Sequence, residues 1–168
     1  MREAIIRAVS TGEINPETGR SETELERLDR NLNELFMGLR VALPGVQVLF
    51  AFLLVLPFQS GFPDVTAFQE KVYFATLLCT MIASVMLIAP SARHRIRFRK
   101  DDKAYVVFSA SRLTIAGLVF LGLGMIGAIL LVSDYLFGAA TATIATLLVA
   151  IALFWLWFGS PLARDMGD

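Results

Sequence analysis

The sequence has very few residues of the kinds that build metal centres or disulfides. It contains one cysteine, Cys79, and one histidine, His94. A lone cysteine forms no disulfide within its own chain, and neither residue stands at metal-ligand spacing from another ligand. Because Cys79 lies within an apolar run, we interpret it as a small buried apolar residue. The sequence predicts no metal site and no cofactor.

Catalytic motifs are missing as well. The sequence has no P-loop, no glycine-rich phosphate cradle and no nucleophile–base set. Its apolar runs hold no pair of carboxylates, which ion-coupled carriers commonly use. The first ten residues do not resemble a signal peptide, because Arg7 interrupts an apolar stretch that is far too short. We expect a protein that is not an enzyme and whose first membrane helix acts as its own insertion signal.

Charged residues are scarce, at 18% of the chain, whereas hydrophobic residues make up 56%. A typical soluble domain is about 25% charged and about 45–50% apolar. The apolar residues form four runs, at about 41–58, 67–89, 112–132 and 139–158, and none has a charge near its centre. At about 1.5 Å per helical residue, each run crosses a hydrocarbon core about 30 Å thick. The predicted fold is an all-α integral membrane protein with a four-transmembrane-helix bundle in residues 41–162.

The segment before the first run divides into two parts. Residues 1–20 are rich in turn formers, and we expect a flexible cytoplasmic tail. Residues 21–40 predict an amphipathic cytoplasmic helix, whose opposite face is mainly acidic and therefore poorly suited to anionic lipid. Five leucines form one stripe of this helix: Leu25, Leu28, Leu32, Leu35 and Leu39. We expect this stripe to pack on another protein helix, either within the subunit or between subunits.

Basic residues gather between the second and third runs. This segment contains Arg93, Arg95, Arg97, Arg99 and Lys100. By the positive-inside rule, it and both termini face the cytoplasm. We expect these side chains to bind anionic lipid headgroups rather than nucleic acid. The alternation of basic and apolar residues across 91–105 fits either a small β-hairpin or cytoplasmic extensions of two helices.

Two further patterns predict local packing. Thr66 and Gln69 have the spacing of a capping box at the start of the second membrane helix. Small residues recur at helical spacing in the third and fourth runs, and close approach of membrane helices depends on such residues. We therefore expect these two helices to meet through Gly117, Gly124 and Ala128 on one side and Ala139, Thr143, Thr146 and Ala150 on the other.

Two residues near the start of the first run are candidates for a functional role. Pro44 cannot donate a backbone hydrogen bond and clashes with the carbonyl of Arg40, so it predicts a kink. That kink either directs the chain into the membrane or acts as a gating hinge. Gln47 lies about one turn further on, and an amide in hydrocarbon needs polar partners. It either joins helices or lines a polar pathway.

Four other candidates lie near the predicted membrane surfaces. Arg40 and Arg112 begin the first and third runs, where they either extend to lipid phosphates or take part in an ion pair. Such a pair would join Arg112 to Glu34 or another acid of the N-terminal helix, and it would hold that helix under the bundle or guard a pore mouth. Asp134 either ends a helix or attracts ions at the outer mouth. His94 is an interfacial residue or a pH sensor, and its positive neighbours disfavour its charged form.

The motifs ELxxxLRVALPGVQ and APSxxHRxxFR resemble those of a family of small actinobacterial four-helix membrane proteins of unknown function. The resemblance covers about residues 24–162 and leaves out the first twenty residues. It implies a bacterial inner-membrane protein but no established activity and no established site, although some members carry the label sodium:proton antiporter. The shared motifs include Glu34, Arg40, Gln47, His94, Arg95 and Arg112.

Three hypotheses for function follow. Four helices enclose little space, so the first is a small homo-oligomeric ion channel or ion transport protein for small inorganic ions. Gln47 would line its path, and Arg40, Glu34 and Arg112 would ring its cytoplasmic mouth. The second is a non-transport scaffold or regulator that uses the N-terminal helix and the basic segment. The third, an ion-coupled antiporter, depends on the family label alone.

Overall fold

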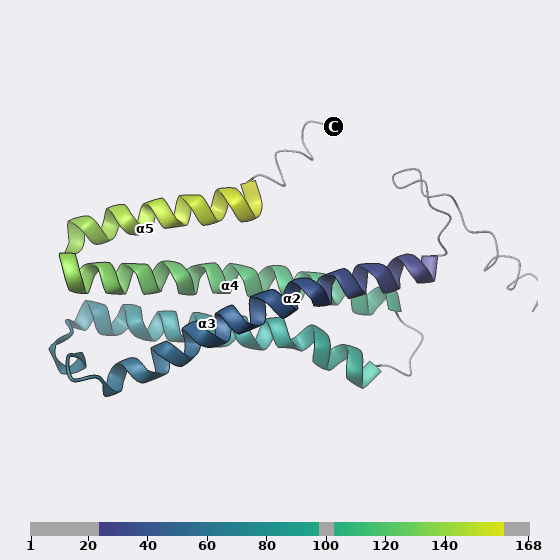
Figure 1. Cartoon of the computed structure of the whole chain (residues 1–168), viewed down its shortest axis with the longest axis horizontal. Coiled ribbons are helices and arrows are strands. Elements are labelled where there is room, and N and C mark those ends of the chain that lie inside the picture. Colours follow the sequence, from purple (N-terminus) through teal and green to yellow (C-terminus); the bar gives the residue numbers. More distant parts are fainter. Residues whose placement is uncertain (1–23, 98–102, 160–168) are drawn as a thin grey trace, which may run out of the picture.

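The computed structural model describes residues 24–97 and 103–159, and every regular element in these two ranges is helical (Figure 1). The long helices are α2 (Glu24–Val55), α3 (Ala67–Arg97), α4 (Lys103–Phe137) and α5 (Ala139–Phe154). Short 3-10 turns, η1 (Leu56–Phe58) and η2 (Phe62–Asp64), connect α2 to α3, and a π-helical turn, η3 (Trp155–Gly159), follows α5. The predicted all-helical class is confirmed for these residues, whereas the predicted tail of residues 1–20 lies outside them.

Four helical segments are long and apolar enough to cross a membrane. They are Asp29–Phe58, Ala67–Arg93, Ser109–Phe137 and Ala139–Gly159. Large apolar side chains cover their outer surfaces, and Val41 and Phe52 are 80% and 71% exposed. A soluble monomer rarely exposes apolar surface on this scale. These helices mark the chain as a multi-pass membrane protein.

The helices form an open layer rather than a ring around a central space. Figure 1 shows α5, α4 and α3 lying side by side, with α2 crossing α3 and α4 obliquely. Among the described residues, α5 packs along α4 and not along α2 or α3, whereas α4 contacts all three other long helices. One end, where η1 and η2 lie, is called the Gly61 end below. The opposite end, where α3 ends and α4 begins, is called the Arg95 end.

The closest helix contact joins α3 and α4. A Cβ atom added at Gly117 would lie 2.8 Å from Leu87, and one at Gly124 would lie 2.7 Å from Thr80. The glycine face of α4 therefore packs on α3, and the prediction that it meets the fourth membrane helix is wrong. Helical spacing identifies a face that permits close approach, but two neighbouring helices compete for that face and the spacing does not choose between them.

Three hydroxyl groups of α3 are satisfied within α3 itself, whereas the buried hydroxyl of Thr114 on α4 has no hydrogen-bond partner among the described residues. Thr76 Oγ1 donates to the carbonyl of Val72 at 2.7 Å, and Ser84 Oγ donates to the carbonyl of Thr80 at 2.9 Å. Thr80 Oγ1 donates to the carbonyl of Leu77 at 2.9 Å. Such bonds let polar side chains stay inside an apolar interface without partners on another helix. The interface is therefore a packing surface.

The basic segment between the second and third membrane spans consists mainly of extensions of α3 and α4. α3 continues through the buried Pro90 to Arg97, and α4 begins at Lys103. Only residues 98–102 between them lie outside the described residues. Of the two alternatives for residues 91–105, the helix extensions are confirmed and the β-hairpin is wrong. The backbone groups of a helix form hydrogen bonds within the helix itself. An alternation of basic and apolar residues at a helix end therefore does not require pairing with a second strand.

The last two leucines of the α2 stripe, Leu35 and Leu39, pack within the subunit. Leu39 and Val46 are buried against Ala83 and Leu87 of α3 and Leu121 of α4. Leu35, a turn before Leu39, packs against the same cluster. The helix is continuous from Glu24 to Val55, so the N-terminal helix and the first span are one element. Leu35 and Leu39 thus pack on the helices of their own chain, and the opposite face of α2 at this level is uncovered.

Candidate functional site

The uncovered side of α2 carries a line of exposed residues that we call the α2 outer face: Asn33, Arg40, Pro44, Gln47 and Ala51. The three polar members follow one another at intervals of seven residues, and residues seven apart lie nearly above one another on a helix. Each interval rises about 10 Å. Asn33 is not among the candidates predicted from the sequence, although its position seven residues before Arg40 could have identified it.

Gln47 is the polar residue of this face that lies deepest in the apolar span. Its side chain is exposed, and it makes no hydrogen bond to any described residue. It does not join the helices of this chain, because the neighbouring Val46, and not Gln47, faces the core. Leaving an amide in hydrocarbon without a partner costs about 1–3 kcal/mol in protein mutational data. A partner for Gln47 has to come from outside the described chain.

Pro44 lies on the same face, one turn before Gln47. The helix continues through this proline, whose side chain is exposed. Proline has no backbone N–H, so the carbonyl of Arg40 receives no hydrogen bond from the residue four positions later. The α2 outer face therefore carries a backbone acceptor in addition to the amide of Gln47 and the guanidinium of Arg40.

The acidic and basic candidates near the Arg95 end are arranged differently from the sequence prediction. Glu34 Oε1 lies 3.8 Å from Arg30 Nε, and both side chains are partly or largely exposed. Arg112 is exposed on α4 and makes no ion pair with a described acid. The predicted pair between Arg112 and Glu34 is therefore not formed by the described residues. A surface pair such as Arg30–Glu34 contributes about 0–1 kcal/mol.

The basic residues at the end of α3 are only partly described. Arg93 and Arg95 are exposed in the last turns of α3. His94 and Arg97 belong to the same helix, but their side chains are not described. Arg99 and Lys100 lie outside the described residues. Lipid contacts of all five basic residues and pH sensing by His94 stay predictions.

At the Gly61 end, Thr66 and Gln69 form the capping box predicted from their spacing. The backbone N–H of Thr66 donates to Gln69 Oε1 at 3.0 Å, and the backbone N–H of Gln69 donates to Thr66 Oγ1 at 3.3 Å. These bonds satisfy two N–H groups that the helix start would otherwise leave unpaired. They also hold the Gln69 side chain in one orientation.

Asp134 is bound to this capping box from the other helix. Gln69 Nε2 donates to Asp134 Oδ2 at 2.9 Å, and Gln69 is 7% exposed. We call this bond the Gln69–Asp134 clamp. α4 does not end at Asp134 but continues to Phe137, and Gly138 then turns the chain with a φ of 81°. The clamp joins residues 65 positions apart, so no local pattern could have found it.

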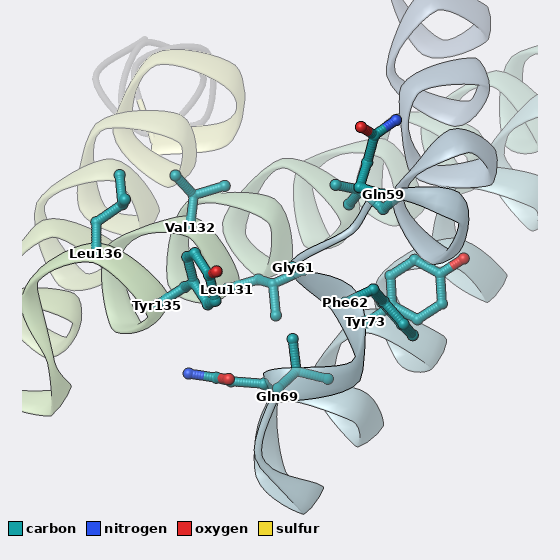
Figure 2. Close-up of a pocket in the computed structure, with 11 residues that line it drawn as sticks. Gln59, Gly61, Phe62, Gln69, Tyr73, Leu131, Val132, Tyr135 and Leu136 are labelled. Atoms are coloured by element: carbon teal, nitrogen blue, oxygen red, sulfur yellow. The ribbon is translucent and has the colours of Figure 1, made fainter.

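A cavity of about 330 Å³ lies next to the clamp (Figure 2). We call it the Gly61 pocket. Its walls come from η1, the η1–η2 connection, the first turns of α3 and the last turns of α4, and they are almost wholly apolar. Figure 2 shows Val132, Tyr135 and Leu136 on the α4 side, with Gly61 and Gln69 opposite. Pockets that bind small molecules commonly begin at about 300 Å³.

Fixed side chains form the α3 wall of the Gly61 pocket. Tyr73 is buried, and its hydroxyl donates to the carbonyl of Leu53 at 3.1 Å. The rings of Phe62 and Tyr73 meet edge to face, with centroids 5.3 Å apart. Gln69 is held by the capping box and the clamp. The pocket is thus shaped before any ligand arrives.

Metal-ligating side chains do not gather within residues 24–97 and 103–159. No group of three or more His, Cys, Asp or Glu residues in these ranges could hold a metal ion. Cys79, which the sequence predicts to be a buried apolar residue, is half-buried and free. The polar groups available in the described part are amides, arginines, carboxylates and hydroxyls.

Comparison with known proteins identifies the chain by family alone. Neither the curated proteins nor the solved structures gave a match. Residues 21–161 match a family of unknown function, DUF6328, and this range includes α2 to α5 and both sites described above. A match over this much of the chain shows membership, and the chain belongs to the DUF6328 family.

Proposed function

We propose that this chain assembles into a small homo-oligomeric ion channel or ion transport protein, with the α2 outer face lining the pathway. One observation carries the proposal: Gln47 exposes its amide within an apolar span and has no hydrogen-bond partner among the described residues. Polar residues inside membranes usually face water-filled cavities or other protein groups. Water in a pathway between subunits would satisfy this amide.

More than one copy is needed for such a pathway. The helices of one chain form an open layer, in which α5 packs only along α4 among the described long helices. Copies arranged with their α2 outer faces toward one axis would bring Asn33, Arg40 and Gln47 of each copy into register along that axis. Leu35 and Leu39, which already pack within each subunit, would stay behind this lining.

The charges of this face favour a small inorganic anion. Arg40 is exposed and makes no ion pair with a described acid, whereas Glu34 lies beside Arg30. Repeated in each copy, Arg40 would form a ring of positive charge, and such rings favour anions. Toward the Gly61 end the helix presents Ala51 and the exposed Phe52, an apolar stretch that would gate by dewetting.

The Arg95 end is proposed to face the cytoplasm. Arg93 and Arg95 are exposed at the end of α3, and the positive-inside rule places such residues on the cytoplasmic side. Arg40 would then ring the cytoplasmic mouth, and both chain termini would be cytoplasmic. Labelling of single cysteines introduced at Arg95 and at Ser60 in sealed vesicles tests this orientation.

Flux from proteoliposomes tests the transport proposal. We expect chloride efflux above that of empty vesicles, with smaller fluxes of sodium, potassium and protons. Gln47→Leu removes the amide but keeps a side chain of similar size, so chloride flux is expected to fall about tenfold or more, as expected for loss of a hydrogen bond worth about 1.5 kcal/mol. Thr141→Leu is the matched control, because Thr141 is an exposed polar residue on α5. Its flux should stay unchanged.

Three results would contradict the proposal. Intact oligomers that give no flux of any ion above empty vesicles would remove transport and leave a scaffold or regulator. Unchanged flux in Gln47→Leu would remove the α2 outer face from the pathway. A reversal potential that follows sodium or potassium in place of chloride would refute the role given to Arg40.

A further inference from the structure

We propose that the Gly61 pocket binds a singly charged cationic amphiphile, with its alkyl chain inside the pocket and its ammonium group at the rim near Asp134. This site is separate from the α2 outer face and does not depend on the proposed transport function. It lies at the Gly61 end, where α3 and α4 are joined by the Gln69–Asp134 clamp.

The pocket itself selects an apolar ligand body. Its volume is about 330 Å³, and its walls include Leu56, Val65, Leu131 and Leu136. Burial of a hydrocarbon chain against such walls gains about 25 cal/mol for each Å² removed from water. Because the pocket lies at the end of apolar helices, an amphiphile can enter it from the membrane surface without leaving its polar group in hydrocarbon.

The rigid wall increases the affinity expected for this ligand. Tyr73 is fixed by its bond to Leu53, and Gln69 is fixed by bonds to Thr66 and Asp134. A preformed site loses less conformational freedom when it binds. Gly61 contributes as well, because a Cβ atom there would lie 2.9 Å from the hydroxyl of Tyr135. The absence of that atom lets Tyr135 stand against the η1–η2 connection, as Figure 2 shows.

The charges around the pocket select a cation. Asp64, Glu70 and Asp134 lie in or beside the elements that form the pocket, and Lys71 is the one base in the same described segments, 59–71 and 131–138. Three acids and one base leave an excess of two negative charges. The carboxylate of Asp134 is one hydrogen bond behind the pocket wall, because Gln69 both lines the pocket and donates to it. An anionic headgroup is therefore disfavoured.

Aromatic rings supply a second reason for a cation. Phe62, Tyr73 and Tyr135 all line the pocket. A cation within about 6 Å of an aromatic ring centre is attracted by the electrons of the ring face, and quaternary ammonium groups are bound in this way. The hydroxyl of Tyr135 makes no hydrogen bond to a described residue, so it is also available to a polar group of the ligand.

Equilibrium dialysis with radiolabelled dodecyltrimethylammonium tests the proposal. The protein is held in nanodiscs of zwitterionic lipid, and binding to empty nanodiscs is subtracted. We expect saturable binding of one molecule per chain. Dodecyl maltoside, which is neutral, should compete weakly, and dodecyl sulfate, which is anionic, should not compete. Linear uptake equal to that of empty nanodiscs would overturn the proposal.

One set of substitutions tests whether the ligand binds in the Gly61 pocket, and another tests whether the charge of Asp134 contributes to binding. Val132→Trp and Leu136→Trp each place a large ring at the pocket from a largely exposed position, so either one should abolish saturable binding. Val119→Trp, at an exposed site of α4 outside the pocket lining, is the matched control and should bind normally. Two tryptophan positions are used so that a folding defect in one variant does not decide the result. Retained binding in both, when both are folded, refutes the location.

Asp134→Asn tests the charge without removing the clamp. An asparagine carbonyl oxygen can still accept the bond from Gln69, so the pocket keeps its shape. Affinity for dodecyltrimethylammonium should fall about tenfold, as expected when a unit charge several ångströms away in a half-exposed site is removed. Competition by dodecyl maltoside should stay the same. Equal binding of the cation to Asp134→Asn and the original chain would refute the selection of a cation.

Discussion

Removal of the Asp134 carboxylate is expected to loosen the hairpin formed by α3 and α4. The side chain accepts a hydrogen bond from Gln69 at 2.9 Å, and Gln69 is buried. A hydrogen bond to a charged group contributes about 1.5–3 kcal/mol in water-soluble proteins. Bonds between membrane helices average less, about 0.6 kcal/mol with a maximum near 1.7. Since this bond lies at a helix end, Asp134→Ala should lower the free energy of unfolding by about 1–2 kcal/mol.

Three further variants distinguish the contribution of the clamp to stability from that of the capping box. Asp134→Asn keeps an acceptor for Gln69 and should cost less than about 1 kcal/mol. Gln69→Ala loses the clamp and one bond of the capping box, so it should cost about 2–3 kcal/mol. Asp64→Ala removes an exposed acid at the same end and serves as the control. Its effect should stay within about 0.5 kcal/mol, as for most surface substitutions.

Unfolding in mixed micelles, followed by circular dichroism, measures these free energies. The decisive quantity is the coupling between Gln69→Ala and Asp134→Ala in a double-mutant cycle. Because the two residues touch, the coupling should be at least about 0.5 kcal/mol. If Asp134→Ala costs no more than Asp64→Ala, or if the two substitutions are additive, the clamp does not stabilise the hairpin and our reasoning is wrong.

Two further predictions concern glycines. Gly124→Leu should destabilise the α3–α4 contact by about 1–3 kcal/mol, because even a Cβ atom would lie 2.7 Å from Thr80. Gly45→Leu, where nothing lies within 4 Å, is its control, and comparable losses in the two variants in micellar unfolding would contradict the packing argument. Gly138→Ala should cost about 1–2 kcal/mol, because its φ of 81° is strained for a residue with a side chain. Gly38→Ala, in open space within α2, should be neutral or stabilising in the same assay.

Local patterns predicted local structure well. Thr66 and Gln69 form their capping box because the bonds of that motif join residues only three positions apart. The sequence also predicts the leucine stripe of α2, with a partner either within the subunit or between subunits. For Leu39 the first alternative is confirmed, since this residue is buried against α3 and α4 of the same chain. The stripe alone does not identify its partner, because any apolar helix face could pack against these leucines.

Contacts between residues far apart in the sequence are predicted less accurately. Glu34 lies near Arg30 rather than Arg112, because a partner one turn away on the same helix needs no particular approach of two helices. The glycines of α4 pack on α3, whereas the sequence predicts packing on α5. For Asp134 the sequence predicts helix termination or capping, or attraction of ions, but not its bond to Gln69 on another helix. These contacts depend on which helix lies beside which, and helical periodicity contains no such information.

The sequence by itself determined that this chain has four apolar helices, because a span needs only length and hydrophobicity, which are sums over neighbouring residues. Only the tertiary structure decided that the helices form an open layer, that Gln47 faces away from its own chain, and that Gln69 lines a pocket while bonded to Asp134. Those features depend on contacts between residues far apart in the chain. In an apolar environment, close packing and a few hydrogen bonds choose among many helix arrangements of similar hydrophobicity.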